Sequence, residues 1–294
     1  MSQKPNRQSD QIKRRQLKIR ELTEKIKSIV LSPYRFFILV CFVVGFIFCS
    51  VTVGMGVYAF TFYRSLPAIE KMTFSNLKTL ALKRIQKKNP QAYHWVGIKN
   101  ISRDYLYSIV MSEDSTFFEH DGINFEAIKN SLAYNLLNKE YKYGASTISQ
   151  QVVKNLFLTE DKTILRKLSE LLITEKLEKR FKKNEILEIY FNVAEFGPNL
   201  FGIGPAARHY FKKSPKNINA AEGAFIAIML PSPKRYHYSV FENENLTHDK
   251  KKKIRRILSD MLSNEYISYK QYQNYLHYPF YQSKHHGRGL AGKH

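Results

Sequence analysis

Carboxylates and a histidine surround two phenylalanines in the stretch EDSTFFEHDG, residues 113–122. A carboxylate buried beside aromatic rings loses hydration and its proton affinity shifts, which costs stability and is usually retained for a functional reason. An ordinary helix end also fits the stretch, with Asp114 or Ser115 as the cap and His120 as a hydrogen-bonded polar residue. Taken alone, the stretch leaves both interpretations open.

A second stretch, GASTISQQVVKNLFL at residues 144–158, predicts a helix with one polar side. The polar residues at steps of three, four and seven are Thr147, Gln150, Gln151 and Lys154. Thr147 followed three residues later by Gln150 is a capping-box pattern, which is a sufficient structural reason for these two residues. The polar side either faces solvent or lines a site for a polar ligand. Solvated helix faces usually carry Glu and Lys rather than paired glutamines.

A third stretch, residues 166–192, combines a charged pair with a basic cluster. Arg166 and Glu170 are one turn apart and can form an ion pair, worth about 0.2–0.5 kcal/mol on an exposed helix. The basic residues near the predicted helix end are Lys167, Lys176, Lys179, Arg180, Lys182 and Lys183. Their position complements the helix dipole, and it would equally suit the diphosphate of a lipid-linked substrate.

The composition limits the possible partners. With 294 residues the chain can hold one large domain or two small ones. Its net charge of +22 is compatible with nucleic acid, an anionic membrane surface or a phosphorylated substrate. Cys41 and Cys49 lie in one apolar run, so neither a disulfide framework nor a cysteine metal site is expected.

An apolar run at residues 36–63 carries no charged side chain and predicts a transmembrane helix, which needs about 20 residues. A cleaved signal peptide has a shorter apolar core, about 7–15 residues, close to the N-terminus. Here the polar segment 1–35 comes first, and it is rich in Lys and Arg. The positive-inside rule therefore predicts a cytoplasmic N-terminus and an exported domain after Arg64, which argues against a nucleic-acid partner.

The remainder of the chain reads as mainly α. Apolar residues recur at three- and four-residue steps in runs at 105–113, 123–138, 147–158, 164–181, 184–196, 202–211, 219–230 and 251–267. No run alternates like a strand, and no glycine-rich phosphate loop occurs. The expected division is a basic tail at 1–35, a transmembrane helix at 36–63, a juxtamembrane linker at 64–92, a mainly helical domain at 93–278 and a flexible tail at 279–294.

In order, the stretches EDSTFFEHDG, GASTISQQVVKNLFL, RKLSE, KKNEILEIYFN and FGIGPAARHYF resemble the peptidoglycan glycosyltransferases. The resemblance covers about half the chain, from Tyr93 to about Tyr238, and is greatest for the monofunctional, membrane-anchored biosynthetic transglycosylases. It implies a lysozyme-like helical glycosyltransferase domain with a smaller membrane-associated lobe, preceded by one transmembrane helix. Too few residues follow Tyr238 for a transpeptidase domain, so none is expected.

The resemblance also implies a reaction. Such enzymes polymerise lipid II into glycan strands by an inverting transfer that forms β-1,4 linkages and releases undecaprenyl diphosphate. Glu113 matches the general base that takes the proton from the acceptor 4-hydroxyl, and Glu170 matches a second catalytic glutamate beside the donor diphosphate. Asp114, Phe117 and His120 match residues that build the site, where His120 would orient either Asp114 or Glu113.

The remaining site residues are also implied by this match. Thr147, Gln150, Gln151 and Lys154 match the helix that lines the site, and Arg166 and Lys183 match positions that contact donor phosphates. Countercharge for the leaving diphosphate would come from such cations or from a divalent ion, so Mg²⁺ or Mn²⁺ is optional, no cofactor is obligatory and no metal ligand is assigned.

The implied partners are lipid II, the growing glycan strand and membrane lipids, with other cell-wall synthesis or division proteins as candidates. The implied location is the bacterial plasma membrane, as a single-pass protein with an extracytoplasmic catalytic domain. Two departures from the family pattern stand out: Ala145 replaces a glycine, and Lys182 replaces a serine. Neither departure affects the two glutamates, so an active enzyme is expected.

Three rival functions remain. A lysozyme-like lobe with one catalytic glutamate could cleave glycan, but Lys154, Arg166 and Lys183 would then have no diphosphate to neutralise. A basic scaffold for cell-wall partners would need no catalytic Glu113. A metal phosphohydrolase built on His120 lacks further His or Asp residues at a suitable spacing.

Overall fold

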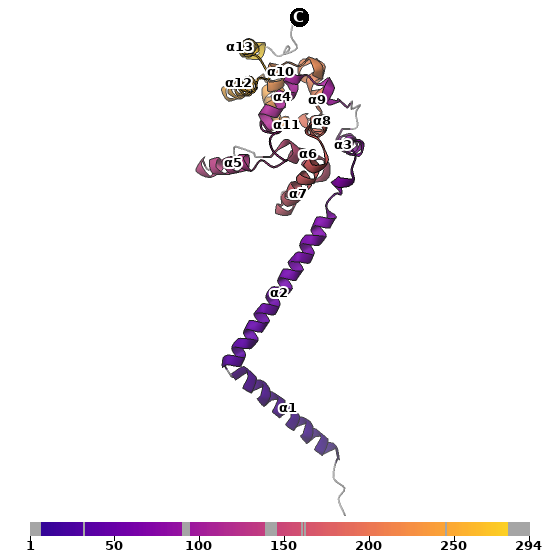
Figure 1. The fold of residues 1–294 in the computed structure, drawn as a ribbon, viewed down its shortest axis with the longest axis vertical. Coiled ribbons are helices and arrows are strands. Elements are labelled where there is room, and N and C mark those ends of the chain that lie inside the picture. The colour runs from indigo at the N-terminus through magenta and orange to yellow at the C-terminus, as the bar shows by residue number, and fades with distance from the viewer. Residues whose placement is uncertain are drawn as a thin grey trace, which may run out of the picture. The chain divides into compact units, whose positions relative to one another are not determined.

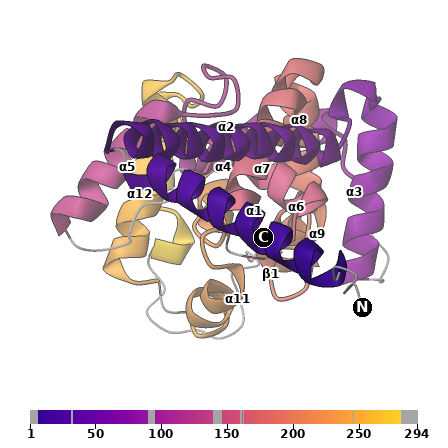
Figure 2. The ribbon, with the colours of Figure 1, turned by 90° about the horizontal axis from the view of Figure 1, so that it is seen from below.

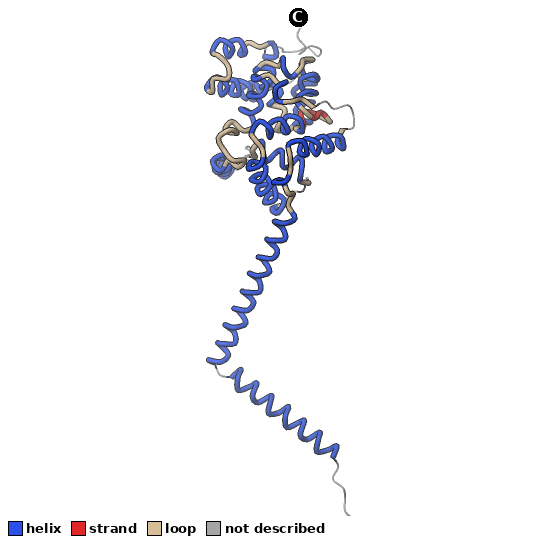
Figure 3. The backbone as a smooth tube through the Cα atoms, turned by 45° about the vertical axis from the view of Figure 1, so that its right-hand side comes forward, coloured by secondary structure: helices blue, strands red, loops and turns tan. Residues whose placement is uncertain are grey.

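The computed structural model describes residues 7–31, 33–89, 95–138, 146–159, 161, 163–244 and 246–281. The chain divides into two compact units, Met1–Leu66 and Pro67–His294. The described residues of both units are mainly helical (Figure 1), and Figure 3 shows that strands contribute one short hairpin to this described part. The prediction of a mainly α chain with one long apolar helix near its N-terminus is confirmed.

The described residues of the first unit form two helices, α1 (Arg7–Leu31) and α2 (Pro33–Ser65). α2 contains the predicted apolar run at 36–63 and buries none of its side chains within the protein. By length and composition it can cross a membrane. A helix that is apolar on every side is stable only where something apolar surrounds it, and a bilayer supplies that environment.

The second unit holds the remaining elements. They are α3 (Phe74–Lys88), α4 (Arg103–Glu113), α5 (Phe125–Asn138), α6 (Ile148–Phe157), α7 (Ile164–Arg180), α8 (Lys183–Val193), β1 (Glu195–Gly197), β2 (Leu200–Phe201), α9 (Ile203–Phe211), α10 (Ala220–Ala227), α11 (Pro233–Tyr236), α12 (His248–Ser263) and α13 (Tyr269–Leu276). The strands pair antiparallel. This hairpin interrupts the run at 184–196, which was expected to be wholly helical. Asn199 at the turn has a φ of 53° and Gly202 has a φ of 88°, so the chain reverses in the gap between the predicted runs 184–196 and 202–211.

α3 occupies part of the segment 64–92, where only a linker was expected. Thr73 caps the helix by accepting a hydrogen bond from the backbone N–H of Asn76. Leu77, Ala81 and Ile85 are buried, and α3 packs against α8 (Figure 2). This helix is therefore part of the core of the second unit.

α4 is held closely by α10, and this contact fixes the helix that ends at Glu113. The Ser108 hydroxyl donates to the Ala220 carbonyl over 3.1 Å. A Cβ atom on Gly223 would lie 2.6 Å from the Ser108 Oγ, so only glycine permits this approach of the two helices. α4 also packs against α12.

α6 packs against both α7 and α8. Its buried apolar side is formed by Val152, Val153 and Leu156, as the spacing of apolar residues predicted. The unusual residue Ala145, which precedes α6, lies outside the described residues.

Candidate active site

Glu113 is the last residue of α4 and is partly buried. The Gln151 side-chain amide donates to Glu113 Oε2 over 3.0 Å. Burial raises the pKa of the Glu113 carboxyl, and the charge of Asp114 adds to this, while Gln151 and the positive charge of Lys253 oppose it. A carboxylate with a raised pKa, and with one oxygen that accepts no hydrogen bond within the described residues, can take a proton from a hydroxyl.

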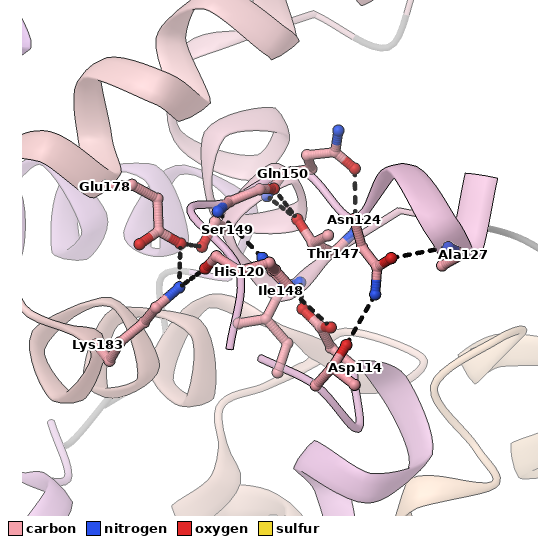
Figure 4. Close-up of polar contacts among 12 residues, drawn as sticks. Asp114, His120, Asn124, Ala127, Thr147, Ile148, Ser149, Gln150, Glu178 and Lys183 are labelled. Carbon is pink, nitrogen blue, oxygen red and sulfur yellow. Dashed lines mark hydrogen bonds and ion pairs between the residues drawn. The ribbon is translucent and has the colours of Figure 1, made fainter. Parts of the chain in front are cut away.

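His120 orients Asp114, which settles an assignment that the sequence left open. His120 Nε2 lies 2.9 Å from Asp114 Oδ1, and the Gly122 backbone N–H donates to His120 Nδ1 over 3.1 Å. Since Nδ1 accepts this bond, Nε2 carries the ring N–H and donates a hydrogen bond to Asp114. The other oxygen of Asp114 accepts from the Ile148 backbone N–H over 3.0 Å, which ties the end of α4 to the start of α6 (Figure 4).

Thr147 and Gln150 form the predicted capping box of α6. The Thr147 hydroxyl also donates to the Gly122 carbonyl over 2.6 Å. Both side chains are buried, and Gln150 Nε2 has no hydrogen-bond partner in the described part of the chain. Thr147 and Gln150 therefore face the protein interior, whereas Gln151 contacts Glu113 and Lys154 is exposed.

Replacing Gly122 with alanine should destabilise the second unit by about 1–3 kcal/mol. Gly122 has a φ of 86°, and an added Cβ would lie 2.7 Å from both Thr174 Cγ2 and Glu178 Cγ on α7. Denaturant unfolding measures the effect. Gly97→Ala is the matched control, because its new Cβ would meet nothing closer than 3.9 Å. Equal unfolding midpoints for the two variants would contradict the expected strain.

Glu170 forms a second group with two cations. Arg166 Nη1 lies 2.8 Å from Glu170 Oε2, as the one-turn spacing predicted, and the Lys167 ammonium contacts Oε1. Glu170 is 3% exposed and shares one face of α7 with Thr174 and Glu178, one and two turns further on. Because Gly122 packs against those two residues, Glu170 faces the side of α7 that contacts the 114–122 loop.

The predicted site residues thus fall into two groups. The group around Glu113 contains Asp114, Phe117, His120, Thr147, Gln150, Gln151 and Lys183, and the second group contains Arg166 and Glu170. Within the described residues, Lys154 forms no hydrogen bond or ion pair. Phe117 is buried as expected, but Phe118 is 42% exposed, so burial of the site involves Phe117 alone of this pair.

In α12, Lys253 acts electrostatically on Glu113, and Lys250 lies close enough to act on Lys253; the sequence motifs predicted neither residue. Burial lowers the pKa of Lys253, and the charge of Glu113 opposes that shift. Burial also lowers the pKa of Lys250 to about 8, helped by Lys253 and Arg235. Lys253 precedes the buried Ile254 and lies one turn before the buried Ile257, a position that flanks the apolar stripe. That flanking position is the only trace of the contact in the sequence.

Replacing Lys253 with methionine should move the acidic limb of the pH–rate profile to higher pH. Lys253 lowers the pKa of Glu113, so its removal raises that pKa further, and the base then loses activity at a higher pH. Initial rates of the catalysed reaction, measured at several values between about pH 5 and pH 9, give the pH of the acidic limb in each variant. Lys252→Met, at an exposed position on the same helix, should leave the limb in place. A limb that does not move in Lys253→Met would contradict this electrostatic role.

Among the described residues, no group of three or more His, Cys, Asp and Glu side chains is arranged to hold a metal ion. Both oxygens of Asp114 and of Glu170 are already engaged by protein donors. Among the described residues, the cations that contact or act electrostatically on the two glutamates are Arg166, Lys167 and Lys253, and Lys183 lies against the 114–122 loop.

A mainly helical domain with a partly buried glutamate among cations fits an enzyme of the glycosyl-transfer class. The profile of the transglycosylase family matches residues 79–262, more than half of the chain. The chain belongs to this family. The match begins inside α3, in agreement with the packing of that helix on α8.

Curated relatives carry the same assignment. The chain is 42% identical over 177 residues to the biosynthetic peptidoglycan transglycosylase of Haemophilus influenzae, covering 60% of this chain and 71% of that protein. It is 43% identical over 185 residues to the protein of the same name from Nitrosospira multiformis, covering 62% of this chain and 78% of that protein.

Proposed function

We propose that the chain is a peptidoglycan glycosyltransferase that elongates glycan strands from lipid II. In this reaction the 4-hydroxyl of the acceptor sugar attacks the anomeric carbon of the lipid-linked strand. The bond between that carbon and the diphosphate oxygen breaks, and undecaprenyl diphosphate leaves with the bonding electrons. Attack from the opposite face inverts an α-linked donor and forms a β-1,4 bond.

Glu113 takes the proton of the attacking hydroxyl. Its raised pKa supports this role, since a base works best when its pKa lies near the working pH. Gln151 holds one carboxylate oxygen and leaves the other for the substrate. The single observation that carries the proposal is this partly buried, hydrogen-bonded glutamate with Lys253 in electrostatic range.

The cations stabilise the departing diphosphate. Lys154 has no partner within the described residues and is exposed, so its ammonium is available to a phosphate. The ion pair between Arg166 and Glu170 supports a role for Glu170 in orienting Arg166 on the donor side. Mg²⁺ or Mn²⁺ would supply similar countercharge, and it remains an optional addition.

The membrane contact of the enzyme has two parts in this proposal. α2 anchors the chain, with its basic N-terminal side in the cytoplasm. α5 exposes Phe125, Leu136 and Leu137, and the first turn of α7 exposes Ile164, at fractions between 70% and 89%. Exposed apolar groups of this size support a lobe that enters the outer leaflet, where the polyprenyl chain of lipid II is dissolved.

The deciding experiment incubates the purified full-length chain with labelled lipid II in phospholipid vesicles. The proposal expects a polymer that lysozyme degrades, with release of undecaprenyl diphosphate. Cleavage of added glycan strands without polymer formation would instead identify a lytic enzyme. A protein inactive in both assays would reject glycosyl transfer as its function.

A further inference from the structure

Lys183 has its contacts inside the protein, although its sequence position suggested a contact with donor phosphates. Its ammonium donates to the His120 carbonyl over 2.5 Å and to Glu178 Oε1 over 2.9 Å. The same ammonium lies 4.5 Å from the centre of the Phe117 ring. With two protein acceptors and an aromatic face around it, little of this ammonium is left for a phosphate.

Glu178 connects this lysine to α6. Its Oε1 accepts both from Lys183 and from the Ser149 hydroxyl in the first turn of α6. The Glu178 side chain is 6% exposed and that of Lys183 is 24% exposed, so water screens the pair only partly. Figure 4 shows Glu178 and Lys183 on one side of this network, with Ser149 and His120 as their neighbours.

We propose that Glu178 and Lys183 are positioning residues that clamp the 114–122 loop to the first turn of α6. This inference rests on the proposed function, because it assigns the two residues to the geometry of its general base. The clamp acts on both elements that place Glu113: the loop that follows it and the helix that carries its partner Gln151.

Two series of contacts, here called routes, connect Lys183 and Glu178 to the first turn of α6. On one route, Lys183 holds the His120 carbonyl, the His120 ring donates to Asp114, and Asp114 accepts from the Ile148 N–H. On the other route, Glu178 holds Ser149, the residue after Ile148. Both routes end in the first turn of α6, so release of either one lets the loop move relative to Gln151.

The experiment compares Lys183→Met, Lys183→Arg and Glu178→Gln with the matched control Lys182→Met, an exposed lysine next to the clamp. Steady-state kinetics on lipid II give kcat and KM separately. Lys183→Met and Glu178→Gln are expected to lose about 10²-fold in kcat, the scale of a misplaced catalytic group, with KM unchanged. Lys183→Arg should recover part of the loss, and Lys182→Met should match the unmodified enzyme.

The pH profile separates positioning from a merely structural role. Loss of the Gln151 hydrogen bond raises the pKa of Glu113, so the acidic limb of the kcat profile should move to higher pH in Lys183→Met. The other charged groups that act on Glu113 are Asp114 and Lys253, and the charge of Glu113 in turn helps to raise the pKa of the buried Tyr190. None of these three residues is substituted in the variants.

Inorganic pyrophosphate provides the opposing test. If Lys183→Met raises KM and weakens inhibition by pyrophosphate while kcat stays intact, Lys183 contacts the donor phosphates and the clamp is rejected. If Lys183→Met does not fold, Ser149→Ala removes a single bond to the same carboxylate, and its kcat and pH profile decide in the same way. An unmodified enzyme that makes no polymer would reject the proposed function, whereas an active enzyme with unaffected variants would reject the clamp alone.

Discussion

Replacing Glu113 with glutamine is expected to lower kcat for glycan polymerisation by about 10²–10⁴-fold, the usual contribution of a general base. Glutamine keeps the size of the side chain and can still accept the hydrogen bond from Gln151, but it cannot take the proton of the acceptor hydroxyl. Initial rates with labelled lipid II measure the loss. Glu119→Gln, at an exposed position of the following loop, serves as the control and should retain activity.

The same variant should be more stable than the unmodified protein at neutral and basic pH. Burial raises the pKa of Glu113 in the folded state, so its ionised form is disfavoured there relative to the unfolded chain. The penalty is absent below the unfolded pKa of about 4.3 and appears as the pH rises through the raised folded value. Thermal unfolding of Glu113→Gln should therefore show a gain at pH 8 that disappears towards pH 4.

Two results would contradict this account of Glu113. A variant that still polymerises lipid II at the normal rate would remove the general base from the mechanism. A variant that loses activity together with stability at pH 8 would show that the side chain is structural rather than strained for function.

The sequence predicted the helices of the site well because their apolar positions repeat strongly. The runs at 105–113, 147–158 and 164–181 correspond to α4, α6 and α7 within a few residues. The local pattern of Thr147 and Gln150 predicted the capping box of α6. The one-turn spacing of Arg166 and Glu170 predicted their ion pair. Such interactions join residues three or four positions apart, so the residue order alone can predict them.

The contacts that decide the chemistry are not local. Whether His120 orients Glu113 or Asp114 depends on how the loop folds back, with Gly122 at a positive φ. Lys253 reaches Glu113 only because α4 packs against α12. Lys183 looked like a phosphate ligand by family position, yet its ammonium is held by Glu178 and a backbone carbonyl. Tertiary packing fixes each of these contacts, so residue spacing alone does not predict them.

Replacing Glu170 with glutamine is expected to cost about 10²-fold in kcat and about 1–3 kcal/mol in stability. One buried carboxylate holds both Arg166 and Lys167, and the amide would leave these two neighbouring cations without a countercharge. The stability cost stays moderate because both cations reach solvent, which screens their repulsion.

α7 supplies its own control for this prediction. Glu175 and Lys179 form an ion pair of the same one-turn spacing, but their side chains are 52% and 73% exposed. Glu175→Gln should change the free energy of unfolding by less than about 1 kcal/mol and leave polymerisation intact. Equal effects of Glu170→Gln and Glu175→Gln would show that the buried pair has no special role.

A double-mutant cycle then tells how Glu170 acts. If Glu170 works by orienting Arg166, the combination of Glu170→Gln with Arg166→Gln should be no slower than Arg166→Gln alone, since the oriented group is already lost. If Glu170 acts on the substrate or on a bound cation directly, the two losses should add in free energy. The observed geometry, with Arg166 Nη1 2.8 Å from the carboxylate, predicts the first result. Additive losses would move Glu170 from a positioning residue to a catalytic one.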